Sequence, residues 1–290
     1  MSAGPPPYGA LLDAVRGVRW PAARRVTGAT LGAHPSQLRG NSSEFSEFRL
    51  YRQGDDPRRV DWRLLARSDR AYVRLTTDRA TFRTSMLVDA SASMAFPLPG
   101  MAKWRLARDL AVGLASVAHA EADPVGLTVA GEAPGVLAPR ARRSVLLEMM
   151  RLLDATSPGG ATPLAPLVSS ARASRLVIIT DLLGDRDELL AAARLRVASR
   201  DELIVVHVIA EEELEPPESP LLAVDPEQPA LRRILDGALR TEYKERFSRW
   251  LDETAAAVRA AGVRYVRAPT SEAAPHLVRR IAGETARRGA

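Results

Sequence analysis

The feature that most constrains the fold is the alternation of short apolar runs with helical segments after residue 84. Apolar runs at 85–89, 175–181 and 202–209 have strand length, and their apolar residues occupy consecutive positions. The intervening segments 103–120 and 185–199 carry the spacing of helices. Runs that are apolar on both sides of the pleat are typical of parallel strands buried under helices. The pattern therefore predicts an α/β fold with a mostly parallel sheet and helices on both faces.

The remaining elements follow from the same patterns. Two further runs separated by a glycine-containing loop predict a hairpin. The expected strands are 71–77, 124–130, 135–139, 221–224 and 263–269. The expected helices are 11–15, 144–154, 230–262 (one helix or two) and 273–283. The acidic run at 211–213 is expected to be a solvated loop.

Charge sets the start of the chain apart. Residues 1–85 contain 15 arginines and eight acidic residues, a net of +7, whereas the whole chain carries +6. Such a segment could bind an acidic partner, but its acids equally allow internal ion pairs. We favour an internal network of arginines with Asp55, Asp56 and Asp61, in which Phe45 and Trp62 act as packing anchors. We expect an Arg-rich N-terminal segment with β character at 1–83 and an α/β domain at 84–290.

Composition excludes several kinds of site. The chain has no cysteine, which excludes disulfides, a thiolate nucleophile and cysteine-ligated metals. Lys103 and Lys244 are its only lysines, and neither ends a glycine-rich GK[ST] loop, so the chain carries no P-loop. Its apolar stretches fall far short of the ~20 residues that span a bilayer. With no leader pattern either, we expect a cytoplasmic protein without a membrane partner. His207, inside an apolar run, is expected to be a core histidine.

Oxygen-bearing side chains follow the ends of two predicted strands. Asp89, Ser91 and Ser93 stand at a spacing of two after the first strand, and Asp181 ends a later one. Thr162 lies in a glycine-containing loop between them. In parallel sheets the functional site lies beyond the carboxyl ends of the strands. Carboxylate and hydroxyl oxygens are hard ligands that suit Mg²⁺ or Mn²⁺, so the sequence predicts a metal site here.

These five residues resemble the metal-ion-dependent adhesion site (MIDAS) of von Willebrand factor A domains. That site combines a DxSxS loop, a threonine from a second loop and an aspartate after a later strand. The resemblance implies a von Willebrand A-like, doubly wound fold. It also implies that Ser91, Ser93 and Thr162 offer hydroxyl oxygens to the metal, and that Asp89 and Asp181 hold metal-bound waters. One metal position would then be open to an acidic side chain from a partner protein.

The segment upstream resembles the signature of the bacterial domain of unknown function 58 family, in a short form without membrane helices. The matching residues are Gly40, Glu44-Phe45, Arg49-Leu50-Tyr51, Gly54-Asp55, Arg59-Val60-Asp61-Trp62-Arg63, Ala66-Arg67 and Val73-Arg74. This resemblance implies association with MoxR-type AAA+ ATPases in chaperone-like assembly or maturation of a client complex. Because the chain lacks a P-loop, any ATP-driven work must come from such a partner.

Two other functions compete with a non-enzymatic, metal-dependent binding module. An aspartate at a strand end with Mg²⁺ also resembles haloacid dehalogenase-like phosphatases, with Asp89 as nucleophile. Those enzymes start with DxD, where this chain has Ser91, and they need a later lysine, for which Lys244 on a predicted helix is badly placed. The basic N-terminal segment could instead bind nucleic acid, although no nucleic-acid-binding motif supports this. We therefore expect the binding module.

Overall fold

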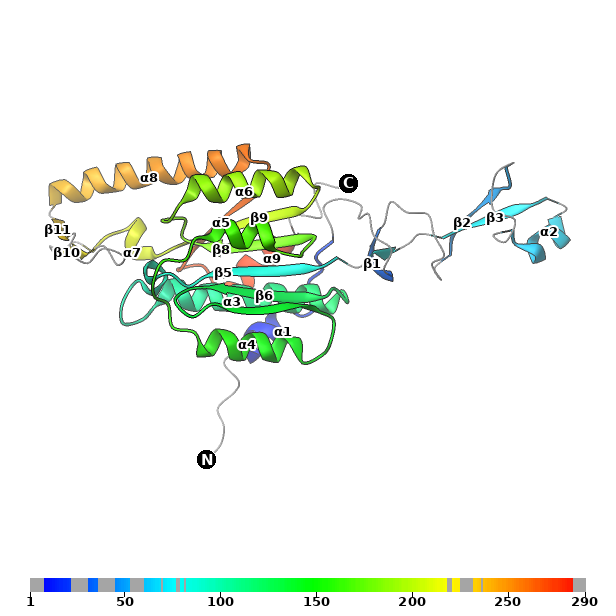
Figure 1. Ribbon diagram of the computed structural model, residues 1–290, viewed down its shortest axis with the longest axis horizontal. Helices are drawn as coiled ribbons and strands as arrows, with labels where there is room; N and C mark the ends of the chain where they lie inside the picture. Colours follow the sequence, from blue (N-terminus) through cyan, green and yellow to red (C-terminus); the bar gives the residue numbers. More distant parts are fainter. Residues whose placement is uncertain are drawn as a thin grey trace, which may run out of the picture.

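The computed structural model describes residues 8–21, 31–35, 45–52, 60–68, 70–76, 79–80, 82–217, 221–224, 232–235 and 237–283. Its centre is a six-stranded sheet in the order β12-β9-β8-β5-β6-β7 (Figure 1). These strands are β5 (Thr84–Asp89), β6 (Val125–Ala130), β7 (Gly135–Arg140), β8 (Arg175–Thr180), β9 (Glu202–Ile209) and β12 (Arg264–Pro269). All neighbours are parallel except β6 and β7, which form the predicted hairpin.

Helices cover both faces of this sheet, so the central strands β5 and β8 are buried on both sides. Along β8, Leu176 and Ile178 pack into one core cluster, whereas Val177 and Ile179 pack into the other. One cluster includes α1 (Gly9–Ala14), α3 (Ala102–Ala120), α4 (Val145–Ala155) and α9 (Ala274–Gly283). The other includes α5 (Leu164–Ser170), α6 (Arg186–Ala198) and α8 (Gly237–Ala260). Each fully buried Leu, Ile or Val contributes about 1.5–3 kcal/mol, which explains the continuous apolar runs.

The strand order confirms the doubly wound, von Willebrand A-like architecture and locates its switch point. From β5 the chain moves to β6 and β7 on one side, then returns to β8 on the other side of β5. In such sheets the crevice beyond the carboxyl ends of the strands, where the order reverses, is the place for a ligand. Asp89 is the last residue of β5, and Asp181 directly follows β8. The topology therefore places these two carboxylates beside the switch point.

The first helix belongs to the core of the α/β domain although it precedes the domain in sequence. Tyr8, Leu11, Val15 and Trp20 are buried in the same cluster as α3 and α9. The expected boundary at residue 83 therefore does not separate residues 8–20 from the domain in space.

A buried arginine at the start of β8 secures this packing. The Arg175 guanidinium lies 4.2 Å from the Trp20 ring and 4.7 Å from the Phe82 ring. It also donates to Glu202 at 3.2 Å and to the Pro21 carbonyl at 3.0 Å. Arginine suits this place because its planar head can stack on aromatic faces while it donates in its own plane.

Among the described residues between 31 and 80, four strands give the N-terminal segment its expected β character. β1 (Leu31–Pro35) pairs with β4 (Arg79–Ala80), and β2 (Phe45–Leu50) pairs with β3 (Tyr72–Thr76). Figure 1 shows β2, β3 and α2 (Trp62–Ser68) apart from the α/β domain.

The expected role of Trp62 as a packing anchor is wrong. Trp62 is the first residue of α2 and is 64% exposed. Asp61 accepts hydrogen bonds from the backbone N–H groups of Arg63 and Leu64, so it caps α2. Asp55 and Asp56, the other acids of the expected ion-pair network, lie outside the described residues.

Two elements near the carboxyl edge of the sheet differ from expectation. Residues 232–235 form β11 (Arg232–Leu235), which pairs antiparallel with β10 (Leu221–Val224), so the helix expected from residue 230 begins only at Gly237. Local helical spacing did not reveal this pairing with a strand about ten residues earlier. The acidic run 211–213 is helical, in α7 (Glu211–Leu214).

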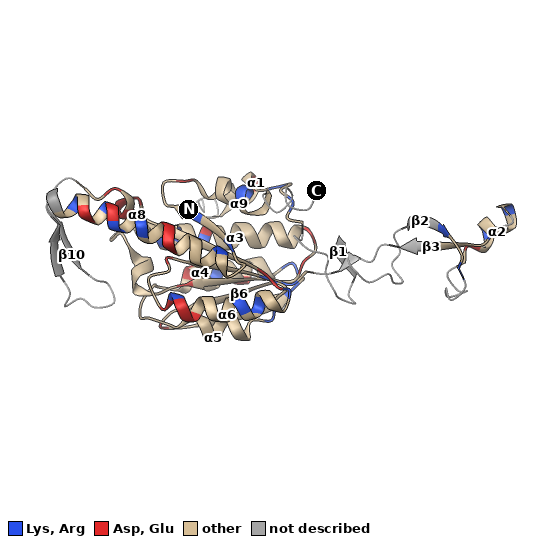
Figure 2. Ribbon diagram, turned by 90° about the horizontal axis from the view of Figure 1, so that it is seen from above, with Lys and Arg blue, Asp and Glu red and all other residues tan. Residues whose placement is uncertain are grey.

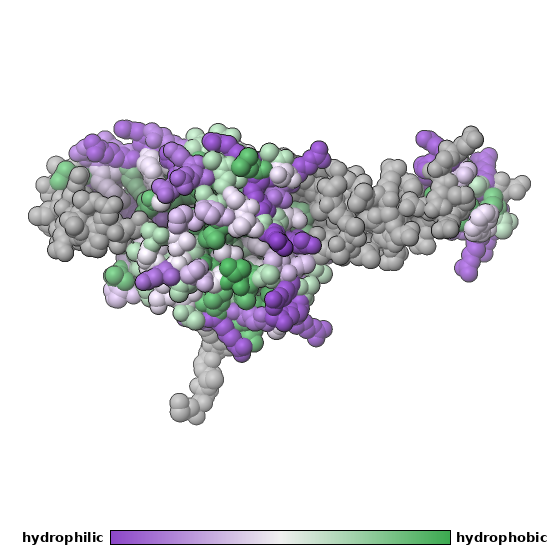
Figure 3. All heavy atoms as spheres, viewed as in Figure 1, coloured by the Kyte–Doolittle hydropathy of each residue, from purple (hydrophilic) through white to green (hydrophobic). Residues whose placement is uncertain are grey.

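Helix α8 is a mostly hydrophilic cover over one face. Figure 2 shows basic and acidic residues alternating along it, and Figure 3 shows hydrophilic side chains over its outer side. None of the helices in the described part of the chain has the length and apolarity that crossing a bilayer requires.

Candidate metal centre

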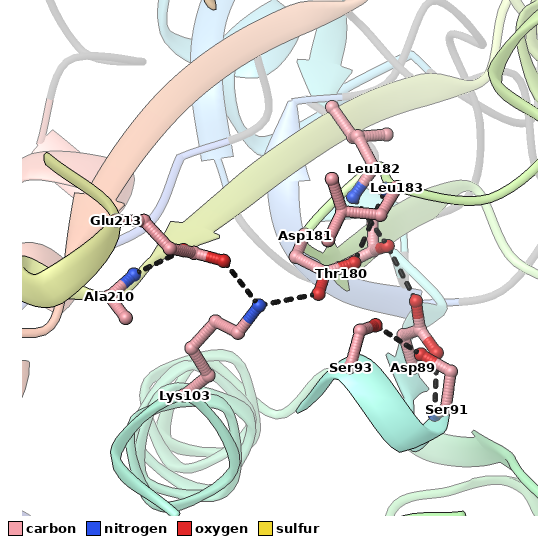
Figure 4. Close-up of polar contacts among 10 residues, drawn as sticks. All are labelled: Asp89, Ser91, Ser93, Lys103, Thr180, Asp181, Leu182, Leu183, Ala210 and Glu213. Carbon is pink, nitrogen blue, oxygen red and sulfur yellow. Dashed lines mark hydrogen bonds and ion pairs between the residues drawn. The ribbon is translucent and has the colours of Figure 1, made fainter. Parts of the chain in front are cut away.

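Asp89 is a buried carboxylate held by neutral hydrogen-bond donors. Its Oδ1 accepts the backbone N–H of Ser91 at 2.9 Å, and its Oδ2 accepts the Thr180 hydroxyl at 2.7 Å (Figure 4). Only 7% of the residue is exposed. Burial, and then the negative charge of Asp181, raise the pKa of Asp89 above its usual value, although the hydrogen bonds oppose this shift. A positive charge next to Asp89 would stabilise its ionised form.

Ser91 and Ser93 present two hydroxyls at the same place. Their Oγ atoms are 3.0 Å apart and both residues are buried. A short 3-10 helix (Ala92–Ala95) follows Ser91 and returns Ser93 to the same side of the loop. Neighbouring ligands of an octahedral cation, each about 2.1 Å from it, stand about 3.0 Å apart. The spacing of the two hydroxyls therefore suits adjacent ligands of Mg²⁺.

The loop that carries Thr162 lies against the loop that carries Asp89. The Gly159 N–H donates to the Ala90 carbonyl at 2.8 Å, and the Ala92 N–H donates to the Gly160 carbonyl at 2.9 Å. Gly160 has φ +67°, which glycine adopts at no steric cost. The Thr162 hydroxyl donates to the Gly131 carbonyl at 3.0 Å. The structure thus joins the two predicted loops, with the threonine hydroxyl bonded to the residue that directly follows β6.

Asp181 lies in a strained turn after β8. Leu182 has φ +56°, a left-handed conformation that costs a non-glycine residue on the order of 1–3 kcal/mol. The turn brings the Leu183 N–H to Asp181 Oδ1 at 3.3 Å and the Leu182 N–H to the Thr180 hydroxyl at 3.1 Å. Thr180 therefore connects the turn to Asp89. Strain of this kind is typical of functional sites.

A lysine that the sequence analysis did not place here neutralises Asp181. Lys103, near the start of α3, points its ammonium between two carboxylates (Figure 4). Its Nζ lies 2.7 Å from Asp181 Oδ2 and 2.9 Å from Glu213 Oε1, and only 1% of the side chain is exposed. Burial would lower the pKa of Lys103, but Asp181 and Glu213 outweigh burial and raise it. The lysine is therefore charged.

Glu213 is a structural part of this cluster, contrary to the expectation of a solvated acidic loop. Its Oε2 accepts the Ala210 N–H at 2.7 Å at the start of α7, while its Oε1 faces Lys103. Lys244, the lysine considered for a phosphatase, instead forms an ion pair with Glu215.

His207 supports the site from β9. Its Nδ1 lies 2.7 Å from the Tyr265 hydroxyl, and the side chain also hydrogen-bonds to the backbone of Asp181. The Trp250 ring packs edge to face against the His207 ring, with 5.4 Å between the two ring centroids. Burial lowers the pKa of His207 to about 4, so it is neutral near pH 7. The prediction of a satisfied core histidine is confirmed.

The oxygen ligands at this site suit a hard divalent cation, and hydroxyl groups contribute to them as much as carboxylates do. Within the described residues, no three His, Asp or Glu side chains gather as a metal-binding group. A cation here would therefore depend on Ser91 and Ser93 beside Asp89. Asp181 is adjacent, but its Oδ2 is bound by the Lys103 ammonium.

Sequence reasoning found Asp89, Ser91, Ser93 and Asp181, which the structure brings together, and missed three further members. Thr180 looked like an ordinary β-branched strand residue. Glu213 was hidden in an acidic run. Lys103 did carry a signal, because a lysine is rare in a chain whose other basic residues are almost all arginines.

Comparison with known sequences gives one family and a set of relatives. The model of the family described as "Protein of unknown function DUF58" matches residues 47–251. Uncharacterized proteins of Mycobacterium tuberculosis and Mycobacterium bovis are 26% identical over 263 residues. Those alignments cover 87% of this chain and 82% of the relatives.

Comparison with solved structures gives only partial overlaps. The conserved hypothetical protein BatB of Bacteroides thetaiotaomicron is 16% identical, with a TM-score of 0.45. An aerotolerance-related membrane protein of Bacteroides fragilis is 18% identical, with a TM-score of 0.46. Each alignment covers 71% of this chain and 99% of the other. Manganese-loaded TRAP protein of Plasmodium vivax is 16% identical over 43% of this chain and 56% of its own, with a TM-score of 0.36. Scores below 0.5 establish neither a shared fold nor a shared ligand, so the fold assignment rests on the strand order.

Proposed function

Because the chain belongs to the family described as "Protein of unknown function DUF58", we propose a function from its site: a non-enzymatic, metal-dependent protein-binding module. The observation that carries the proposal is the cluster of Asp89, Ser91 and Ser93 at the switch point of the sheet, beside Asp181. Bound Mg²⁺ or Mn²⁺ would supply a positive charge that accepts a carboxylate oxygen from a partner protein.

The chain's own residues have separate tasks in this proposal. Ser91 and Ser93 would hold the metal through their hydroxyls, and Thr162 would join them from the neighbouring loop. Asp89 and Asp181 would supply negative charge and orient the water molecules around the metal. Thr180 fixes the orientation of Asp89 through its 2.7 Å hydrogen bond. The buried surroundings strengthen the attraction between these oxygens and a cation.

Apolar side chains beside the site support a protein rather than a small ion as the final ligand. Phe96 and Leu98 follow Ser93 in the loop after β5 and are 39% and 75% exposed. Leu183, in the loop after β8, is 48% exposed. Exposed apolar groups next to a charged anchor are typical of a protein interface, in which a desolvated centre carries most of the binding energy. We propose a partner segment with an Asp or Glu flanked by apolar residues.

We propose a MoxR-type AAA+ ATPase, or the client that it assembles, as this partner. The support is the family resemblance together with the absence of a P-loop in the sequence, which assigns ATP hydrolysis to another chain. Such a partnership would operate in the cytoplasm, where the ATPase finds its ATP.

Calorimetry with Mg²⁺ and Mn²⁺ tests the metal site. We expect wild-type protein to bind one divalent ion and Asp89→Ala to lose that binding while keeping its helical circular dichroism. Asp13→Ala, which removes a 72% exposed carboxylate on α1, is the matched control and should bind like wild type. Equal binding by Asp89→Ala and wild type would disprove the assignment.

A binding assay with the purified MoxR-type ATPase of the same bacterium tests the partner. We expect capture of the ATPase by wild-type protein in Mg²⁺, and its loss both with EDTA and in Asp89→Ala. Capture that survives both changes would mean that the contact does not use this site.

A further inference from the structure

Lys103 forms an ion pair with Asp181, one of the two carboxylates of the proposed metal site. We infer that its ammonium competes with the metal for Asp181. Lys103 would then be the residue that sets how tightly the site holds the metal. This inference rests on the proposed function. It concerns a side chain to which the MIDAS resemblance assigns no role.

Lys103 alone does not balance the negative charge at this edge of the sheet, so a second cation would be electrostatically favourable here. Asp181 and Glu213 share the single ammonium of Lys103, and Asp89 lies close enough to Asp181 for the two carboxylates to repel each other. When all three are ionised, negative charge therefore exceeds positive charge in this cluster. Within the described part of the chain, no cation forms an ion pair with Asp89, whose partners are the Ser91 N–H and the Thr180 hydroxyl. A divalent ion would supply the missing charge.

Both oxygens of Asp181 are already engaged. Oδ2 lies 2.7 Å from Lys103 Nζ, and Oδ1 accepts the Leu183 N–H at 3.3 Å. The short contact is the ion pair, and the long one is a weak hydrogen bond. The carboxylate keeps free lone pairs for a metal-bound water, but a divalent ion beside Asp181 would repel the ammonium that shares this carboxylate. Metal binding therefore costs part of the contact between Lys103 and Asp181.

Glu213 makes this exchange feasible. A buried ammonium without any partner would be strongly unfavourable. Lys103 keeps Glu213 at 2.9 Å on its other side when a metal weakens its contact with Asp181. The lysine thus loses one of two carboxylate partners rather than both, and a metal that carries two charges can displace it.

Calorimetric affinities of Lys103 variants for Mg²⁺ test the competition. We expect Lys103→Met, which keeps the length of the side chain without its charge, to bind at least tenfold more tightly than wild type. Lys103→Arg keeps the charge and should show no such gain. Arg105→Gln removes an exposed positive charge from the same turn of α3 and should stay within twofold of wild type. Unchanged or weaker affinity in Lys103→Met would overturn the inference.

The wild-type protein offers a second test, because the chain contains only two lysines. In protein labelled with ¹⁵N-lysine, two side-chain Nζ signals are expected, and Lys103→Arg assigns them. Saturating Mg²⁺ should move the Lys103 signal and leave the Lys244 signal in place. An unmoved Lys103 signal would contradict the competition, and this measurement decides the matter if Lys103→Met fails to fold.

The results separate this inference from the proposed function. If wild type, Asp89→Ala and Lys103→Met all fail to bind a divalent ion, the proposed function fails and the inference fails with it. If wild type binds, Asp89→Ala does not, and Lys103→Met binds no more tightly than wild type, only the competition is wrong.

Discussion

The two ends of strand β8 each meet a buried cation, and the two cations have opposite surroundings. At the amino end, Arg175 stacks between Trp20 and Phe82 and has one carboxylate partner, Glu202. Beyond the carboxyl end, the Lys103 ammonium faces two carboxylates, with Asp89 nearby. Burial lowers the pKa of Arg175, whereas acidic neighbours raise that of Lys103.

The difference separates a structural role from a functional one. Around Arg175, aromatic faces and backbone carbonyls hold a single positive charge and fasten residues 8–21 to the sheet. Around Lys103, negative charge exceeds positive charge, and the surplus lies next to hydroxyl oxygens. One end therefore stabilises the fold, while the other carries the surplus of negative charge that the proposed metal site would use.

The largest expected effect is at the amino end. Arg175→Met should lower the free energy of unfolding by about 3–5 kcal/mol, because it removes a buried cation that pairs with Glu202, donates to the Pro21 carbonyl and stacks on Trp20. Urea unfolding measures the loss. Mg²⁺ affinity of the folded variant should be unchanged, since the site lies at the other end of the strand. A variant that loses Mg²⁺ affinity but keeps wild-type stability would contradict the assignment of a structural role to Arg175.

A second prediction concerns acid stability at the carboxyl end. Burial lowers the pKa of His207 from its ordinary 6.5 to about 4 in the folded protein, so its contribution to stability is present above pH 6.5 and is lost as the pH falls toward 4. The loss amounts to about 3 kcal/mol over this range. Urea unfolding between pH 7 and pH 4 should show a steeper loss for wild type than for His207→Gln.

The control for this prediction keeps the imidazole and removes its partner. Tyr265→Phe should retain the wild-type pH dependence, because His207 still titrates. If His207→Gln loses stability toward acid as steeply as wild type, another group is responsible.

A third prediction is that substitution of Asp89 raises the stability of the folded protein, whereas substitution of Arg175 lowers it. Asp89 has a raised folded-state pKa, so its ionisation destabilises the folded protein as the pH rises from the usual aspartate range through the folded-state pKa. In EDTA, Asp89→Asn should therefore be more stable than wild type at pH 7, and the difference should shrink toward pH 4. Thermal unfolding at both pH values measures it. A variant less stable than wild type at pH 7 would show that Asp89 is a structural residue.

The smallest expected effect on stability comes from the apolar side chains beside the site. Leu98→Ser changes a side chain that is 75% exposed and should alter the free energy of unfolding by less than about 0.5 kcal/mol. Affinity for the proposed protein partner should nevertheless fall, while Mg²⁺ affinity stays constant. Leu195→Ser on α6, where the side chain is 71% exposed, is the matched control. Equal partner affinity in both variants would place the interface elsewhere.

The strands and most helices could be predicted because each pattern is local. The run at 176–179 is apolar at successive positions since alternate side chains pack into the two core clusters. The strand at 232–235 could not be predicted, because it depends on pairing with Leu221–Val224 rather than on its own sequence. The capping role of Asp61 was likewise obscured by its many arginine neighbours.

By itself, the sequence determined the fold class and four members of the candidate site. Alternating patterns specify a parallel sheet, and strand-end residues in such a sheet share one edge. Only the tertiary structure decided that Asp181 is bound by an ammonium from α3 and that Glu213 holds the same ammonium from α7. These partners lie 78 and 110 residues from Lys103, and no local pattern encodes a contact over such separations. The placement of α3 and α7 at the carboxyl edge created the ion pair, and with it the charge balance on which the proposed metal site would depend.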